Sequence, residues 1–369
     1  PKNQLILALP YYGSLWDSPY SIIPSGNSTF VEHITYADIR KKYINKPVYD
    51  TISYTAYYIE PNPASQGYKQ TWFDDEKTLA KKYDFILEQD LYGVGIWALG
   101  YDNGHTALWK LLDTKFGAHQ ATSKKDSTET QTPADTTQTS TVNITKDSLQ
   151  QLQQKWQDSI LAAVGSLVGK SPTGVITLPG NDSIAFKLKK QIFGWHPYWN
   201  KDKEKYTRYR YDLLSSISYF SYELNPADGS CKNMHDWATT PVVDLAKQNN
   251  CKVYLTVTNQ GEDSNNSFLS NFTAQKNSIP AIVNAVKLRN ANGVTLNFEV
   301  VPGSLSHNLS LYVIGLSNAL KAEGLELNMT IPAKDTRNAF AVEDLLKHVD
   351  QFIIMGYNYY TRGSTVAGP

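Results

Sequence analysis

The feature that most constrains the fold of this 369-residue chain is a regular alternation of short apolar, β-branched runs with stretches of helical periodicity. Six such runs follow residue 191, and apolar residues recur every three or four positions in the stretches between the last four. This alternation is typical of a parallel sheet covered by helices. The expected strands are 192–198, 217–224, 252–258, 293–300, 325–333 and 351–360.

Two further runs of the same kind, at 5–12 and 93–100, precede these six. An irregular insertion and a helix near 76–89 separate the two runs, and a short helix near 104–114 follows them. A total of eight strands predicts a (β/α)8 barrel, or TIM barrel, an α/β fold in which functional groups gather at the carboxyl ends of the strands.

The middle of the chain has a different character. Residues 118–145 are rich in Ser and Thr and contain no Phe, Trp or Tyr, so they cannot bury enough apolar surface to offset chain entropy, which predicts a flexible linker. Behind it an amphipathic helix is expected, and 174–178 is a candidate short strand. We divide the chain into 1–117, 118–191 and 192–369. The apolar face of the expected helix consists of Leu149, Leu152, Trp156, Ile160, Val164 and Leu167.

Charge and composition exclude several classes of function. Lys and Arg total 35 and Asp and Glu total 35, and this zero net charge argues against a nucleic-acid partner or an anionic membrane surface. No apolar stretch is long enough to span a bilayer, so no membrane insertion is expected. No metal or cofactor is expected, because the seven His show no ligand spacing and no Gly-rich phosphate loop or GxSxG turn is present. Cys231 and Cys251 leave free thiols and a single bridge equally open.

A candidate site lies on the run at 293–300. Because side chains alternate along a strand, Thr295, Asn297 and Glu299 share one face, and the opposite face is apolar. If the apolar face packs under helices, the three polar side chains point into the barrel. A carboxylate buried there must be paired, protonated or functional, and it would suit a general acid. The alternative is a structural polar layer in which Glu299 bonds neighbouring hydroxyls.

Aromatic and amide side chains end other predicted strands. Tyr357 and Asn358 end one, and Trp97 ends another, although a Trp at such a position packs in a core more often than it binds a ligand. The flat amphipathic rings of the 24 Tyr and 8 Trp suit sugar rings as well as cores. Further aromatic residues that could wall a groove at this end are Trp195, Tyr198, Tyr12 and Trp16.

Five segments together resemble glycoside hydrolase family 18, the chitinase and chitinase-like family of (β/α)8 barrels. They are LILALPYYGSLW (5–16), the stretch 71–103, FGWHPYW (193–199), GVTLNFE (293–299) and MGYNYY (355–360). The order is rotated, because the runs at 5–12 and 93–100 resemble strands 7 and 8 of the family and the six later runs resemble strands 1 to 6. The chain therefore joins either parts of two tandem barrels or the two parts of one circularly permuted barrel.

The resemblance implies a substrate-assisted retaining mechanism, in which the sugar's own 2-acetamido oxygen attacks the anomeric carbon. Glu299 matches the final Glu of the family motif DGxDxDxE, which protonates the leaving oxygen. Asn297 stands where an Asp orients the acetamido group, and Thr295 and Asn292 replace the two earlier acids. An amide cannot balance the positive charge that develops in the reaction, so the resemblance implies a weakened enzyme.

Other positions match the family pattern with one departure. Tyr357 matches the tyrosine that bonds the acetamido group, Trp97 matches the tryptophan beneath the sugar at the cleavage point, and Asn358 replaces an Asp. The implied function is hydrolysis of β-1,4-linked N-acetylglucosamine polymers, chitin or peptidoglycan-type glycans. An N-acetylated polysaccharide or oligosaccharide is the implied partner, and the alternative is an inactive chitinase-like protein that binds carbohydrate.

The family resemblance also implies an extracellular or cell-surface location. The chain begins at Pro1 without a signal peptide and reads as an excerpt of a longer protein, so this expectation rests on the resemblance alone.

Overall fold

The computed structural model describes residues 1–43, 45–117, 174–177, 183–186 and 188–369. Within these residues, eight parallel strands lie in the order β10, β7, β1, β16, β15, β14, β13 and β11, and a further pairing of β10 with β11 closes the ring. The predicted TIM barrel is confirmed. Its strands are β1 (Leu5–Pro10), β7 (Gly93–Trp97), β10 (Gln191–Pro197), β11 (Ser216–Leu224), β13 (Lys252–Gln260), β14 (Gly293–Glu299), β15 (Glu326–Pro332) and β16 (Gln351–Met355).

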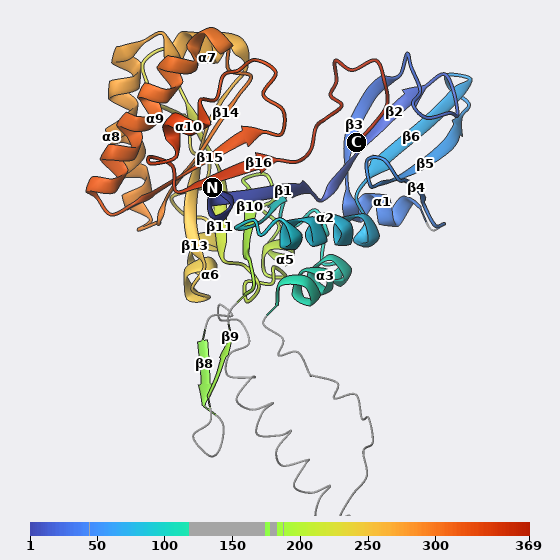
Figure 1. The fold of residues 1–369 in the computed structure, drawn as a ribbon, viewed down its shortest axis with the longest axis horizontal. Coiled ribbons are helices and arrows are strands. Elements are labelled where there is room, and N and C mark those ends of the chain that lie inside the picture. The colour runs from blue at the N-terminus through green and yellow to red at the C-terminus, as the bar shows by residue number, and fades with distance from the viewer. Residues whose placement is uncertain (44, 118–173, 178–182, 187) are drawn as a thin grey trace, which may run out of the picture.

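The two sequence segments share this one barrel. β1 pairs with β16 with Leu5 opposite Phe352, and Figure 1 shows the blue β1 beside the red β16. β7 pairs with β10 with Gly93 opposite Gln191, and a Cβ at Gly93 would lie 2.3 Å from the Gln191 carbonyl oxygen. The strand order is therefore the rotated one that the sequence predicts. The predicted linker and the helix after it lie outside the described residues.

Helices cover the outside of the barrel (Figure 1). Asp75 starts α2 by accepting hydrogen bonds from the main-chain N–H groups of Lys77 and Thr78, an N-cap that satisfies otherwise unpaired donors. The helices are α1 (Tyr36–Lys42), α2 (Glu76–Glu88), α3 (Thr106–Phe116), α5 (Lys203–Tyr206), α6 (Pro241–Gln248), α7 (Glu262–Leu269), α8 (Phe272–Leu288), α9 (Ser306–Ala322) and α10 (Val342–Leu345), with 3-10 turns at Lys2–Gln4 and Gly303–Leu305.

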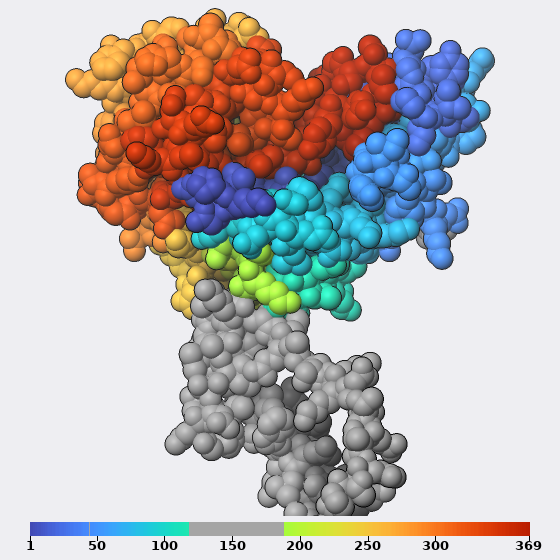
Figure 2. Space-filling view, in the orientation of Figure 1, coloured from blue at the N-terminus to red at the C-terminus, as the bar shows by residue number. Residues whose placement is uncertain are grey.

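The insertion between β1 and α2 is regular, so the expectation of an irregular segment is wrong. It forms a five-stranded antiparallel sheet in the order β3, β2, β6, β5, β4, with α1 beside it. The barrel and this sheet form two lobes in Figure 2, and the red C-terminal segment lies between them. The strands are β2 (Tyr12–Ser18), β3 (Thr29–Thr35), β4 (Val48–Asp50), β5 (Thr55–Asn62) and β6 (Gly67–Phe73).

Three short strands complete the described secondary structure. β8 (Gly174–Thr177) and β9 (Ser183–Phe186) pair as an antiparallel hairpin, and β8 confirms the expected strand near 174–178. β12 (Cys231–Asn233) adds to β11 in the antiparallel direction.

Cys231 is exposed, Cys251 is buried, and both are free thiols. No helix in the described ranges combines the length and the apolar character that a membrane crossing demands.

Two apolar cores follow from the alternation of side chains along the strands. Ile6, Ala8, Phe193, Tyr254 and Ile353 lie in the core inside the barrel. A larger core fills the space between the strands and the helices. The polar residues that point into the barrel are therefore separated from the helices by the strands themselves.

We predict that the two segments stay together after the connecting chain is cut. A protease site introduced within 118–145 should yield two fragments that co-elute as one particle on size exclusion, because strand pairing on both sides of the ring joins them. Two separate peaks would instead favour parts of two independent barrels. The variant Gly93→Val is the control, since its side chain would clash with Gln191 and should loosen the pairing.

His196 is a buried base in the outer core. The residue is 2% exposed, and its Nδ1 lies 3.0 Å from the Tyr209 hydroxyl. Burial lowers the pKa of His196 from 6.5 to about 4, against a smaller opposing effect of Asp236. Because the unfolded chain takes up a proton at higher pH than the folded chain does, folding stability should fall as the pH drops from about 6.5 to about 4.

We therefore predict a pH-dependent loss of stability of on the order of 3 kcal/mol across this window. Denaturant unfolding measured at several pH values checks it. His196→Gln should flatten the dependence, and the same substitution at the exposed His307 is the matched control. Equal slopes in the wild type and in His196→Gln would contradict the assignment.

Candidate active site

A cavity of about 730 Å³ opens at the carboxyl ends of the barrel strands. It is lined by residues from both sequence segments, so its walls meet only because the ring closes. Seven of the nine site residues predicted from the sequence line it, and these are Tyr12, Trp97, Trp195, Asn297, Glu299, Tyr357 and Asn358.

The end of β14 carries the candidate acid. Asn297 Nδ2 donates a hydrogen bond to Glu299 Oε1 at 3.0 Å, and Asn297 Oδ1 accepts one from Thr330 Oγ1 at 2.6 Å. Thr330 thus fixes the orientation of the amide, which turns its N–H toward the carboxylate. Glu299 faces the cavity and is held by an amide, whereas the alternative expectation was a layer in which hydroxyls hold it.

The hydroxyl layer exists one step deeper in the barrel. Ser218 Oγ lies 2.7 Å from Thr256 Oγ1 and donates to Thr295 Oγ1 at 3.0 Å. All three residues are buried. Thr295 therefore belongs to a neutral network below the cavity, and it does not line the cavity.

Tyrosines line the cavity just beyond the ends of β1 and β16, which come directly after β7 in the order of the ring. The Tyr12 hydroxyl donates to Asn358 Oδ1 at 2.5 Å, and the rings of Tyr12 and Tyr357 meet edge to face at 6.1 Å. Burial, with a smaller contribution from Glu299, raises the pKa of both tyrosines. Both hydroxyls stay protonated at neutral pH, and that of Tyr357 can donate a hydrogen bond to a ligand, whereas the Tyr12 hydrogen is already donated to Asn358. Burial also lowers the pKa of His33, which lines the same cavity.

Tryptophans of β7 and β10 lie next to these tyrosines along the ring. Trp97 ends β7 and lies edge to face against Trp195 at 5.9 Å and against Phe220 at 4.9 Å. Trp195 is 1% exposed, so it supports the floor, whereas the partly exposed Trp97 presents a ring to the cavity. A flat ring of this kind suits the apolar face of a sugar.

Two predicted substrate contacts lie elsewhere, and Trp16 is a correction. Trp16 is fully buried in the insertion, where its Nε1 donates to the Gly368 carbonyl oxygen at 3.0 Å. It lies four residues beyond Tyr12 on β2, and a strand advances roughly 3.3 Å per residue, so it is carried past the cavity. Tyr198 is absent from the cavity lining, and its ring stacks on His235 at 3.4 Å.

Sequence reasoning missed several lining residues. Thr330 and Gln260 sit near the ends of β15 and β13, and the same alternation that located Asn297 could have found them. Lys334 follows β15 in a loop, and His33 reaches the cavity from β3 of the insertion. No sequence signal places the latter two, because their positions depend on the path of loops and of a second sheet.

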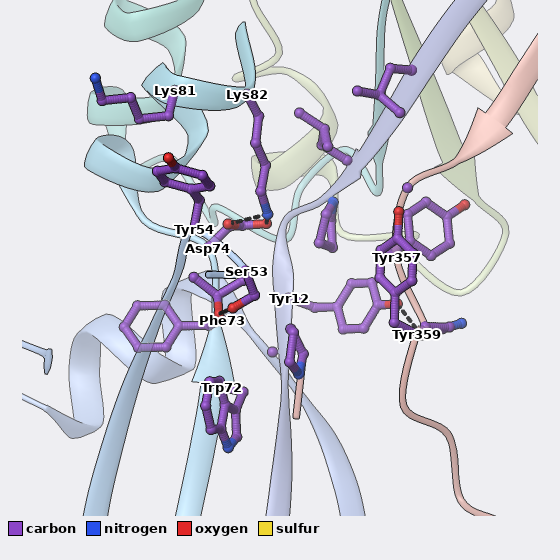
Figure 3. A pocket seen from close by; sticks show the side chains of 18 of the residues that line it. Tyr12, Ser53, Tyr54, Trp72, Phe73, Asp74, Lys81, Lys82, Tyr357 and Tyr359 are labelled. Carbon is purple, nitrogen blue, oxygen red and sulfur yellow. Dashed lines mark hydrogen bonds and ion pairs between the residues drawn. The ribbon is translucent and has the colours of Figure 1, made fainter. Parts of the chain in front are cut away.

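A second cavity, of about 710 Å³, lies on the other side of Tyr12 and Tyr357. Figure 3 shows Lys82 reaching Asp74 on one side of it and Tyr12 and Tyr357 on the other. Both carboxylate oxygens of Asp74 lie 2.6 Å from Lys82 Nζ. The buried acid of this cavity is therefore already neutralised, and its other acids are Asp84, which pairs with Lys115, and the exposed Glu88. Among the described residues, no cluster of three or more His, Cys, Asp or Glu could hold a metal ion.

Comparison with known proteins gives a family match. The family model described as "Glycosyl hydrolases family 18" matches residues 1–102 and 191–369. The "Putative sporulation-specific glycosylase YdhD" of Bacillus subtilis is 28% identical over 160 residues, which cover 41% of this chain and 37% of that protein. The match thus spans well under two thirds of this relative.

Three solved structures overlap with part of the chain. The Bacillus subtilis YdhD structure covers 39% of this chain and 50% of its own, with 26% identity and a TM-score of 0.37. The spore cortex-lytic enzyme SleL of Bacillus cereus covers 50% and 46%, with 18% identity and a TM-score of 0.40. The chitinase of Chromobacterium violaceum covers 46% and 57%, with 19% identity and a TM-score of 0.40.

Proposed function

Because this chain belongs to glycoside hydrolase family 18, we propose that it hydrolyses β-1,4-linked N-acetylglucosamine polymers, of the chitin or peptidoglycan type, by a substrate-assisted retaining mechanism. The observation that carries the proposal is the position of Glu299, which faces one cavity together with Trp97 and Tyr357. Since these substrates are polymers, we also propose that the protein acts outside the cell or at its surface.

Glu299 is the proposed general acid. It delivers a proton to the glycosidic oxygen as the bond from that oxygen to the anomeric carbon breaks. The acetamido oxygen of the same sugar forms the new bond to the anomeric carbon. Water then gives a proton back to Glu299 as it attacks that carbon, which breaks the bond to the acetamido oxygen and opens the oxazolinium ring. No protein nucleophile is required, which fits a cavity whose described lining residues include Glu299 as their only acid.

Asn297, Tyr357 and Asn358 are the proposed contacts to the acetamido group. Tyr357 can donate a hydrogen bond to the acetamido oxygen, because its hydroxyl stays protonated. Asn297 is neutral, so it can orient the group but cannot balance the positive charge that develops on it. Electrostatic stabilisation at comparable sites is worth on the order of 3 to 4 kcal/mol, so we expect slow turnover.

The second candidate is a carbohydrate-binding protein without catalysis, and the neutral Asn297 favours it. In both functions Trp97 would stack under the sugar, with Trp195 and Tyr12 beside it in the same cavity. Both the hydrolase and the binding protein should lose oligosaccharide binding in Trp97→Ala. Only a measurement of turnover can therefore distinguish the two functions.

We predict that the intact protein releases reducing ends from N-acetylated oligosaccharides and that Glu299→Gln does not, because an amide cannot donate the proton. The exposed Glu343→Gln is the matched control and should retain the wild-type rate. Binding measured by tryptophan fluorescence should survive in Glu299→Gln. Oligosaccharide binding by the wild type with no turnover would support the binding protein instead.

We also predict that Asn297→Asp raises turnover tenfold or more. The new carboxylate would supply the missing negative charge beside the acetamido group, and it could share a proton with Glu299 across the position of the present 3.0 Å hydrogen bond. Initial rates on the same oligosaccharide check this. An unchanged rate, with folding intact, would show that the site lacks more than this one charge.

A further inference from the structure

The residue that follows the candidate acid has an unfavourable backbone conformation. Val300 has a φ of +62°, in the left-handed region that a β-branched residue rarely adopts. Such a conformation is unfavourable for a β-branched residue and persists only where the surroundings hold it in place. The turn comes directly after Glu299, the last residue of β14, so it sets how Glu299 enters the cavity.

Two hydrogen bonds hold this turn through the main-chain oxygen of Glu299. Asn265 Nδ2 donates to it at 2.6 Å, and the N–H of Gly261 donates to it at 3.2 Å. Asn265 lies on α7 and is 0% exposed. The shorter bond therefore comes from a side chain shielded from water, where a hydrogen bond is stronger and an unpaired group is more costly.

Asn265 is itself held in one orientation. Its Oδ1 accepts a hydrogen bond from Asn259 Nδ2 at 3.0 Å, and its Nδ2 also donates to the Gly261 carbonyl oxygen at 3.0 Å. Asn259 is 3% exposed. With its donor and acceptor sides both occupied, the Asn265 amide has a single satisfied arrangement.

We propose that Asn265 is a positioning residue for Glu299, which holds the end of β14 in the strained turn that directs the carboxylate into the cavity. The inference rests on the proposed function, because it assigns Asn265 a part in placing the acid. Asn265 does not line the cavity and acts only through the main chain of Glu299.

The kinetic test compares Asn265→Ala with the wild type on one N-acetylated oligosaccharide. Misplacing the acid should lower kcat about 10- to 100-fold and leave KM within about threefold, since the sugar contacts remain. Asn265→Asp, which keeps the shape but loses the donor, should behave alike. Asn308→Ala is the matched control, because Asn308 also donates its side-chain N–H to a main-chain oxygen, that of Leu269, and should keep the wild-type kcat.

A second substitution separates positioning from general loss of stability. Asn adopts the left-handed region more readily than Val does, so Val300→Asn in the Asn265→Ala background should recover at least part of the lost kcat. The same double variant should unfold about 2 to 4 °C higher than Asn265→Ala, a shift that needs no substrate to measure.

The outcomes separate the two proposals. A wild type that binds oligosaccharide without turnover contradicts the proposed function. In that case the unfolding temperatures still test whether Asn265 holds the strained turn at Val300. A wild type with turnover, beside a folded Asn265→Ala of equal kcat, overturns the positioning role alone. Loss of kcat that Val300→Asn fails to restore, with the unfolding temperature also unmoved, likewise overturns it.

Discussion

The structure depends on the pairing of β7 with β10, the contact that joins the end of one segment to the start of the other. Two glycines of β7 make the close approach possible. Gly93 lies against the main chain of Gln191, and a Cβ at Gly95 would lie 2.9 Å from the Ala8 side chain and 3.2 Å from the Trp195 ring. A larger residue at either position would push the strands apart. The cavity is lined by both of the segments that this pairing joins, since Trp97 comes from the first and Glu299 from the second.

Neutral groups occupy the inside of the barrel where the family pattern has acids. A buried hydroxyl or amide needs only hydrogen-bond partners, whereas a buried carboxylate needs a counter-charge or a proton. Thr295 finds a partner in Ser218, and Asn297 finds partners in Thr330 and Glu299. Both replacements are therefore satisfied by hydrogen bonds, and Asn297 also holds the Glu299 carboxylate; under the proposed function they leave no second charge to assist a cationic intermediate.

Much of the fold and part of the site follow from sequence patterns. All eight barrel strands appear as apolar runs, because a strand covered on both faces needs apolar residues at most positions. Alternation correctly places Asn297 and Glu299 on the inner face. Trp16 shows where this reasoning ends, because alternation gives a side chain's face but not what the insertion packs over that face. Asn265 was also beyond reach, since its role arises from a bond between a helix and the end of a strand 34 residues later.

The C-terminal segment, residues 356–369, is joined to the antiparallel insertion by several hydrogen bonds. Trp16 Nε1 donates to the Gly368 oxygen, the Ser28 N–H donates to the Thr365 oxygen, and the Ala367 N–H donates to the Ser25 oxygen. Tyr12 adds a fourth link through Asn358. The tyrosines of the cavity are thus tied both to the antiparallel lobe and, through the Gly356 N–H that donates to the Ala8 oxygen, to the ring of strands. The shape of the cavity therefore depends on how the antiparallel lobe is joined to the barrel.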